Sequence, residues 1–139
     1  MKIRLLIFFF AAALFAVACS EKPTQPSSGD VVMTINGDTF QAGDTIVVTV
    51  TNNLDHAVYV SVCPGAEPQK EKNHGEWENV WPPDLCPAVI PPELAPGETM
   101  TRSFDPDWGH GTFRIIQGIF DDQAAIKGRI IYSKKFRVM

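Results

Sequence analysis

The amino-acid sequence predicts an all-β domain, a Greek-key β-sandwich of about seven short strands, and three observations lead to this prediction. Apolar and polar residues alternate in several segments after residue 30, as expected for strands with one buried face. Turn residues interrupt these segments at intervals of about 8 to 15 residues. No apolar pattern with a period of 3.6 residues is long enough for a helix in this region, so an α/β fold is disfavoured.

The first two predicted strands cover residues 31–35 and residues 45–51. Asn36 and Gly37 follow the first strand, and this dipeptide is typical of a hairpin turn because both residues adopt positive φ readily. The second strand places apolar side chains on one face and threonines on the other, which predicts a half-buried strand. Its apolar side chains are Ile46, Val48 and Val50.

Residues 56–63 and residues 76–81 form the next two predicted strands. Trp77 lies between two cysteines in sequence. In some β-sandwich domains a tryptophan packs against an inter-sheet disulfide, so we expect Trp77 to lie in the core. Six prolines follow in residues 82–96 and predict a connection or a sheet edge, because proline has no backbone N–H for a strand ladder.

Three further strands are predicted in residues 99–104, 112–117 and 129–138. The last alternates apolar with basic side chains, although Lys134 interrupts its apolar face. The predicted domain therefore covers residues 31–139, about 110 residues, which is a common size for a single domain.

The N-terminus predicts export and lipid attachment. Lys2 and Arg4 precede an apolar run over residues 5–18, which is shorter than the about 20 residues of a transmembrane helix and is typical of a signal-peptide helix. Ala-Val-Ala-Cys at residues 16–19 resembles a lipobox, the bacterial motif whose cysteine is acylated before cleavage. We therefore expect residues 1–18 to be a lipoprotein signal peptide and Cys19 to carry the lipid. The alternative is an ordinary secretory signal with a cysteine near its cleavage site.

Residues 19–30 predict a disordered tether, because they are rich in Pro, Ser, Glu and Lys and have too little apolar surface to pack. Ser20 after the cysteine favours the outer membrane of a Gram-negative cell envelope. Without residues 1–18, which contain 2 of the 12 Lys and Arg, 10 Lys and Arg stand against 16 Asp and Glu, a net charge of −6. This charge disfavours nucleic acid as a partner, and we expect the membrane contact to be made by the lipid.

Cys63 and Cys86 remain as a pair once Cys19 is assigned to lipid. In an exported protein this predicts a disulfide that closes a loop of about 24 residues and stabilises the fold by about 3 kcal/mol. Two free thiols or half of a metal site are the alternatives. Neither cysteine has the Cys-x-x-Cys spacing of a metal site.

The order of motifs in residues 40–139 resembles that of bacterial immunoglobulin-like domains in uncharacterised lipoproteins. These motifs are the strand in residues 43–53, the strand ending in Cys63, Gly-x-Trp at residues 75–77, Cys86, Pro-Gly-Glu at residues 96–98, Gly-Thr-Phe-Arg at residues 111–114 and Ser-x-x-Phe-x-Val at residues 133–138. The order is more distantly similar to the BsuPI-type intracellular proteinase inhibitor domain. The resemblance implies an immunoglobulin-like sandwich with a binding or structural role, and protease inhibition by analogy with BsuPI.

No pattern predicts catalysis, a cofactor or a metal site. The three histidines lie outside metal-ligand spacing of one another and of the cysteines, and no phosphate loop or nucleophile elbow occurs. We therefore expect a non-enzymatic protein that binds an envelope protein or a carbohydrate, with a protease inhibitor or a structural spacer as alternatives. The predicted binding surface contains Trp81, Trp108 and His110, because exposed tryptophans are enriched at binding hot spots.

Overall fold

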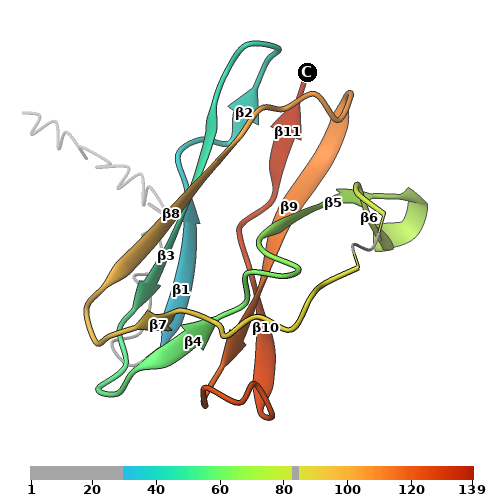
Figure 1. Cartoon of the computed structure of the whole chain (residues 1–139). Helices are drawn as coiled ribbons and strands as arrows, with labels where there is room; N and C mark the ends of the chain where they lie inside the picture. Colours follow the sequence, from blue (N-terminus) through green and yellow to red (C-terminus); the bar gives the residue numbers. More distant parts are fainter. Residues whose placement is uncertain (1–29, 83–84) are drawn as a thin grey trace, which may run out of the picture.

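Figure 1 shows a computed structural model in which two β-sheets face each other. It describes residues 30–82 and 85–139, apart from the side chain of His74. The predicted signal peptide, Cys19 and the predicted tether up to residue 29 lie outside the described residues. Within the part that the structure describes, no helix is long and apolar enough to span a membrane.

The described chain consists of eleven strands and one short 3-10 turn, η1 (Asn73–Gly75), so the predicted all-β class is confirmed. The strands are β1 (Val31–Ile35), β2 (Thr39–Phe40), β3 (Ile46–Asn52), β4 (Val58–Val60), β5 (Glu67–Glu71), β6 (Trp77–Asn79), β7 (Glu93–Leu94), β8 (Thr99–Phe104), β9 (Gly111–Phe120), β10 (Gly128–Tyr132) and β11 (Phe136–Val138).

The strands form two sheets with an immunoglobulin-like order. One sheet has the order β1-β3-β8, and the other has the order β2-β11-β9-β4-β7, with β5 and β10 also paired to β9 and β6 paired to β5. Successive strands β3 and β4 therefore lie in different sheets, and β8 returns to the first sheet beside β3 (Figure 1). This distribution matches the two sheets of an immunoglobulin-like sandwich, and the predicted Greek-key architecture is confirmed.

Strict alternation along β3 and β9 places one face of each sheet in the core. In β3 every second residue from Ile46 to Asn52 is buried, and in β9 the same holds from Phe113 to Ile119. Burial of these side chains is the main favourable term for the fold, at about 25 cal/mol per Å² of apolar surface. The least exposed apolar side chains of this core are Ile46, Val48, Val58, Val60, Phe113, Ile115, Ile119 and Phe136.

Strand β9 is longer than predicted, and each of its neighbours is broken into two strands. Strands β4 and β5 lie along one side of β9, and β10 and β11 lie along the other. At one break the Ser133 hydroxyl accepts a hydrogen bond of 2.9 Å from Ile115 N. At the other, the buried Gln117 side chain donates to Ser61 O at 2.8 Å. These side chains replace ladder hydrogen bonds, so the strand predicted over residues 129–138 is two strands.

The hairpin predicted at Asn36 and Gly37 is wrong. Strand β1 pairs with β3, whereas β2 pairs with β11 in the other sheet, so the chain changes sheets at this point. Asn36 secures the crossing, because its Oδ1 accepts from Val47 N at 2.8 Å and its Nδ2 donates to Thr45 O at 3.0 Å.

Candidate functional site

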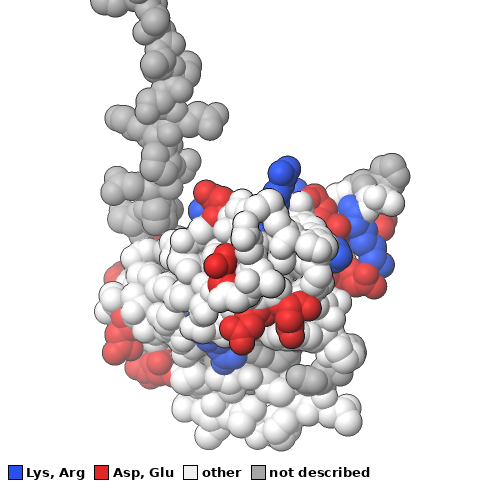
Figure 2. All heavy atoms as spheres, turned by 90° about the horizontal axis from the view of Figure 1, so that it is seen from above, with Lys and Arg blue, Asp and Glu red and all other residues white. Residues whose placement is uncertain are grey.

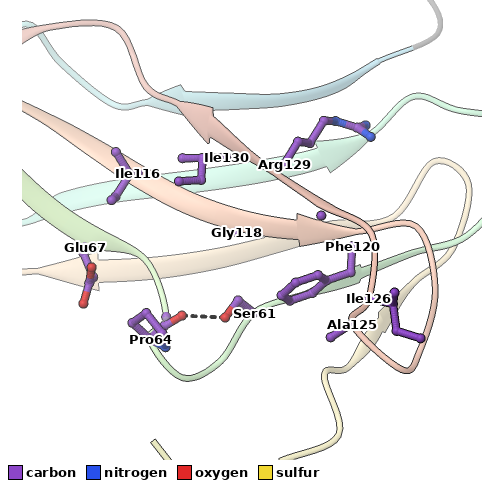
Figure 3. A pocket seen from close by; sticks show the side chains of 12 residues that line it. Ser61, Pro64, Glu67, Ile116, Gly118, Phe120, Ala125, Ile126, Arg129 and Ile130 are labelled. Atoms are coloured by element: carbon purple, nitrogen blue, oxygen red, sulfur yellow. Dashed lines mark hydrogen bonds between the residues drawn. The ribbon is translucent and has the colours of Figure 1, made fainter. Parts of the chain in front are cut away.

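The outward face of β9 and β10 forms an apolar groove, which we call the outer groove (Figure 3). Its floor comes from alternate positions of β9, namely Ile116, Gly118 and Phe120, which point away from the core. Ile130 of β10 pairs with Gly118 and adds a further apolar side chain. The volume of the groove is about 380 Å³, within the size range of known ligand sites.

Two loops form the walls of the outer groove. The segment after β4 contributes Ser61, Pro64 and Gly65, and the turn between β9 and β10 contributes Ala125 and Ile126. The Ser61 hydroxyl donates to Pro64 O at 2.7 Å and holds the first wall in shape (Figure 3). A side chain at residue 118 would crowd this wall, because its Cβ would lie 3.1 Å from the Ser61 Cβ.

A disulfide between Cys63 and Cys86 lies next to this wall, so the predicted pairing is confirmed. It joins the segment after β4 to the proline-rich connection. A smaller hollow of about 170 Å³ lies there, lined in part by Val62, Cys63 and Val89. Ser61, Phe120 and Ala125 line both hollows, so the two adjoin each other.

Large apolar side chains around the groove are exposed to solvent. Ile126 is 80% exposed and Ile130 54%, and Val89 of the adjoining hollow is 51% exposed. Single exposed apolar residues are common on protein surfaces, but a contiguous group around a concave surface marks an interaction site.

Charged groups lie at the rim and not on the floor. Arg129 turns away from the groove, and its guanidinium lies 3.0 Å from Asp121 and 3.7 Å from Asp30. Glu67 of β5 lies at the opposite rim (Figure 3). On the end of the sandwich seen in Figure 2, Lys and Arg are scattered among Asp and Glu and form no continuous basic strip on the visible face.

A stack of aromatic rings and cations continues the same outward face beyond the groove. The Arg114 guanidinium lies 4.2 Å from the Trp77 ring centroid and 4.4 Å from that of Tyr132. Arg114 Nε donates to Gln69 Oε1 at 2.8 Å. Lys135 also lies over Trp77, at 5.2 Å. The predicted core position of Trp77 is therefore wrong, since this ring is half-buried on the outer face and is covered by cations.

Tyr59 flanks the groove at its other end, where it pairs with Phe120. Its hydroxyl donates to Glu93 Oε2 at 3.3 Å. Desolvation, followed by the negative charge of Glu93, raises the pKa of Tyr59, so this hydroxyl is protonated at neutral pH.

The structure brings Trp81 and Trp108 into contact, with their ring centroids 6.2 Å apart. Trp108 packs on Phe113 at 5.5 Å and belongs to the boundary of the core, whereas Trp81 is 40% exposed. Trp108 Nε1 is buried without a hydrogen-bond partner in the described part of the chain. His110 lies on the same loop as Trp108, between β8 and β9, and is exposed. As a binding surface these three residues remain a prediction.

Among the described residues, no three His, Cys, Asp or Glu side chains gather in a group that could hold a metal ion. The arrangement around the outer groove is suited to binding, because its floor offers apolar contacts and few titratable groups.

Sequence reasoning missed the outer groove, although one feature indicates it. Strand β9 is apolar on both faces, with Ile115 and Ile119 inward and Ile116 and Phe120 outward. In a two-layer sandwich the outward face of a strand is ordinarily polar, so apolar residues at both alternating positions suggest a second contact.

No family model matches the sequence, and no curated protein matches it. Among solved structures, the chain is similar to the ASH / PapD-like domain of human CEP192 (PapD-like domain 7), at 15% identity and a TM-score of 0.32. The match covers 99% of this chain and 93% of that chain. The assignment of the fold rests on strand order and register, independently of this likeness.

Proposed function

We propose that this protein is a non-enzymatic bacterial lipoprotein, anchored in the outer membrane through Cys19, whose sandwich binds an apolar side chain of a protein partner in the outer groove. The observation that carries the proposal is the apolar outward face of β9 and β10. Exposed apolar surface of this kind is unfavourable in water unless a partner covers it.

The lining of the groove favours a protein partner over a carbohydrate. A sugar needs several polar groups that fix its hydroxyls, whereas the floor here is formed by Ile116, Gly118, Phe120 and Ile130. Arg114 packs against one side of the Trp77 and Tyr132 rings, so a sugar could not stack on that side of either ring.

The groove can be tested in cells with a photo-crosslinking amino acid at residue 126, using the same residue at Thr101 as a matched control. Thr101 is exposed on the outward face of the other sheet. We expect an adduct with a discrete protein at residue 126 only, and its loss when Ile130→Asp is added. Equal crosslinking at both positions, or no adduct at residue 126, would refute the groove as the binding site.

The anchor needs its own test. Growth with an alkyne-labelled fatty acid should label the wild-type protein and not the Cys19→Ser variant. Membrane fractionation should then recover the variant in the soluble fraction of the envelope. Equal labelling of both proteins would contradict lipid attachment at Cys19.

A second candidate function is inhibition of a protease by the proline-rich connection. Leu85 is fully exposed directly before Cys86, so the disulfide holds an apolar side chain outward next to a crosslink. A panel of serine and cysteine proteases tests this function. Inhibition that is lost in Leu85→Asp would support it, and full protease activity at micromolar concentrations of the protein would exclude it.

A further inference from the structure

We propose that the partner segment carries a carboxylate two residues from its apolar anchor, and that Arg114 binds this carboxylate. This inference rests on the proposed function of the outer groove and specifies the chemistry of its partner.

Arg114 stands next to the groove on the same face. It precedes Ile116 by two residues on β9, and Ile116 pairs with Tyr132, whose ring packs against the Arg114 guanidinium. A strand rises about 3.3 Å per residue, so the two positions are about 7 Å apart. An extended segment running along β9 therefore places alternate side chains over the groove and over Arg114.

The surroundings of Arg114 leave the edge of its guanidinium for a ligand. The rings of Trp77 and Tyr132 pack against the guanidinium from the β5–β6 and β10 sides, and Nε is engaged by Gln69. The terminal N–H groups lie on the remaining edge. A planar guanidinium held in this way has the geometry of paired hydrogen bonds to a carboxylate, and its ordering cost has already been met by the stack.

The charges on this face also point to an acidic group. Lys135, the other cation over Trp77, pairs with Glu71 at 2.7 Å. Arg114 forms no ion pair with any residue that the structure describes. A carboxylate of the partner would complement this half-buried cation.

The test uses the full chain in phosphatidylcholine nanodiscs to select from a random 12-residue peptide library, with empty nanodiscs for subtraction. We expect enriched peptides to have a large apolar residue and, two residues away, Asp or Glu. A parallel selection on Ile130→Asp measures which peptides need the groove.

A selected peptide and its Glu→Gln or Asp→Asn version are then compared on the wild type and on Arg114→Gln. On the wild type the amide peptide should bind about 10-fold more weakly, since a charge-assisted hydrogen bond is lost, and on Arg114→Gln the two peptides should differ less than about twofold. A purely structural role of Arg114 would weaken both peptides equally. Arg114→Lys should retain only part of the discrimination, because lysine lacks the planar fork.

The outcomes separate the two proposals. Peptides that require the groove but show no preference for an acidic residue, or an equal carboxylate effect on the wild type and Arg114→Gln, would overturn the role of Arg114 and leave the groove in place. If no peptide is enriched, or if the enriched peptides bind Ile130→Asp as well as the wild type, the groove itself fails as the binding site and the role of Arg114 fails with it.

Discussion

The outward faces of the two sheets differ sharply, although both cover the same core. On the sheet of β1, β3 and β8, the outward positions are mainly Thr and Ser, with Thr34 opposite Thr49 and Thr49 opposite Thr101. On the sheet of β9 and β10, the outward positions include Ile116, Phe120 and Ile130. The first face suits contact with water, whereas the second suits contact with another molecule.

This difference shows that alternation alone does not locate a binding surface. Both β3 and β9 alternate between buried and partly exposed residues. The chemistry of the outward residues separates them, because small hydroxyls are readily hydrated and large apolar groups are not.

The largest expected effect separates the inner from the outer face of β9. Ile115→Ala should lower the free energy of unfolding by about 2–5 kcal/mol, because this side chain is fully buried and its removal leaves a cavity. Ile116→Ala should cost less than about 1 kcal/mol, because its side chain points outward and is partly exposed. Urea unfolding measures both values, and equal losses would contradict the assignment of the faces.

Removal of the disulfide should affect the groove side more than the threonine face. The double variant Cys63→Ala, Cys86→Ala should lose about 3 kcal/mol of stability, as expected for a loop of this length. Local opening should appear first in amide hydrogen exchange around Ser61, with the β1–β3 ladder protected as before. Faster exchange in β1 and β3 without a change at Ser61 would count against this view.

A smaller effect is expected when one positive charge is added to each outward face in turn. Ile130→Lys should reduce the fluorescence of a hydrophobic dye bound to the protein, whereas Thr101→Lys should leave it unchanged, since the threonine face has no apolar patch to disrupt. Both positions are exposed, so stability should change by less than about 0.5 kcal/mol. A dye signal equal to the wild type in Ile130→Lys would argue against an accessible groove.

The smallest effect concerns the loop between β3 and β4, which connects the two sheets. Asp55 Oδ1 lies 2.9 Å from His56 Nδ1, and this hydrogen bond lowers the pKa of Asp55. Because the folded-state pKa is below the unfolded value, its contribution is present above the usual aspartate pKa and is lost as pH falls through the folded value. Asp55→Asn should therefore remove a shallow acid-side loss of stability. Thermal unfolding between pH 2 and pH 6 measures this effect. The unfolding temperatures of the wild type and Asp55→Asn should change in parallel near pH 6, and below pH 4 that of the wild type should fall more steeply. Equal slopes for the two proteins below pH 4 would disprove the contribution.

Several parts of the fold follow from local patterns. Strands β1 and β8 have the predicted bounds, and β3 is displaced by one residue, because their alternation is strong and continuous. Strand β5, Glu-Pro-Gln-Lys-Glu, was missed because it has no apolar alternation and forms by pairing with β9. Strands β2 and β7 have two residues each, too few for a pattern.

The sequence by itself determined the all-β class and the pairing of Cys63 with Cys86, because alternation and cysteine number are local or countable properties. Only the tertiary structure decided that Trp77 packs against Arg114 on the outer face and not in the core. It also decided that Ile116, Gly118 and Ile130 meet in one groove. The physical reason is that a groove depends on strand register and on the face each residue takes. Register is set by the pairing of β9 with β10 and, across a long stretch of sequence, with β5, and no single segment encodes it.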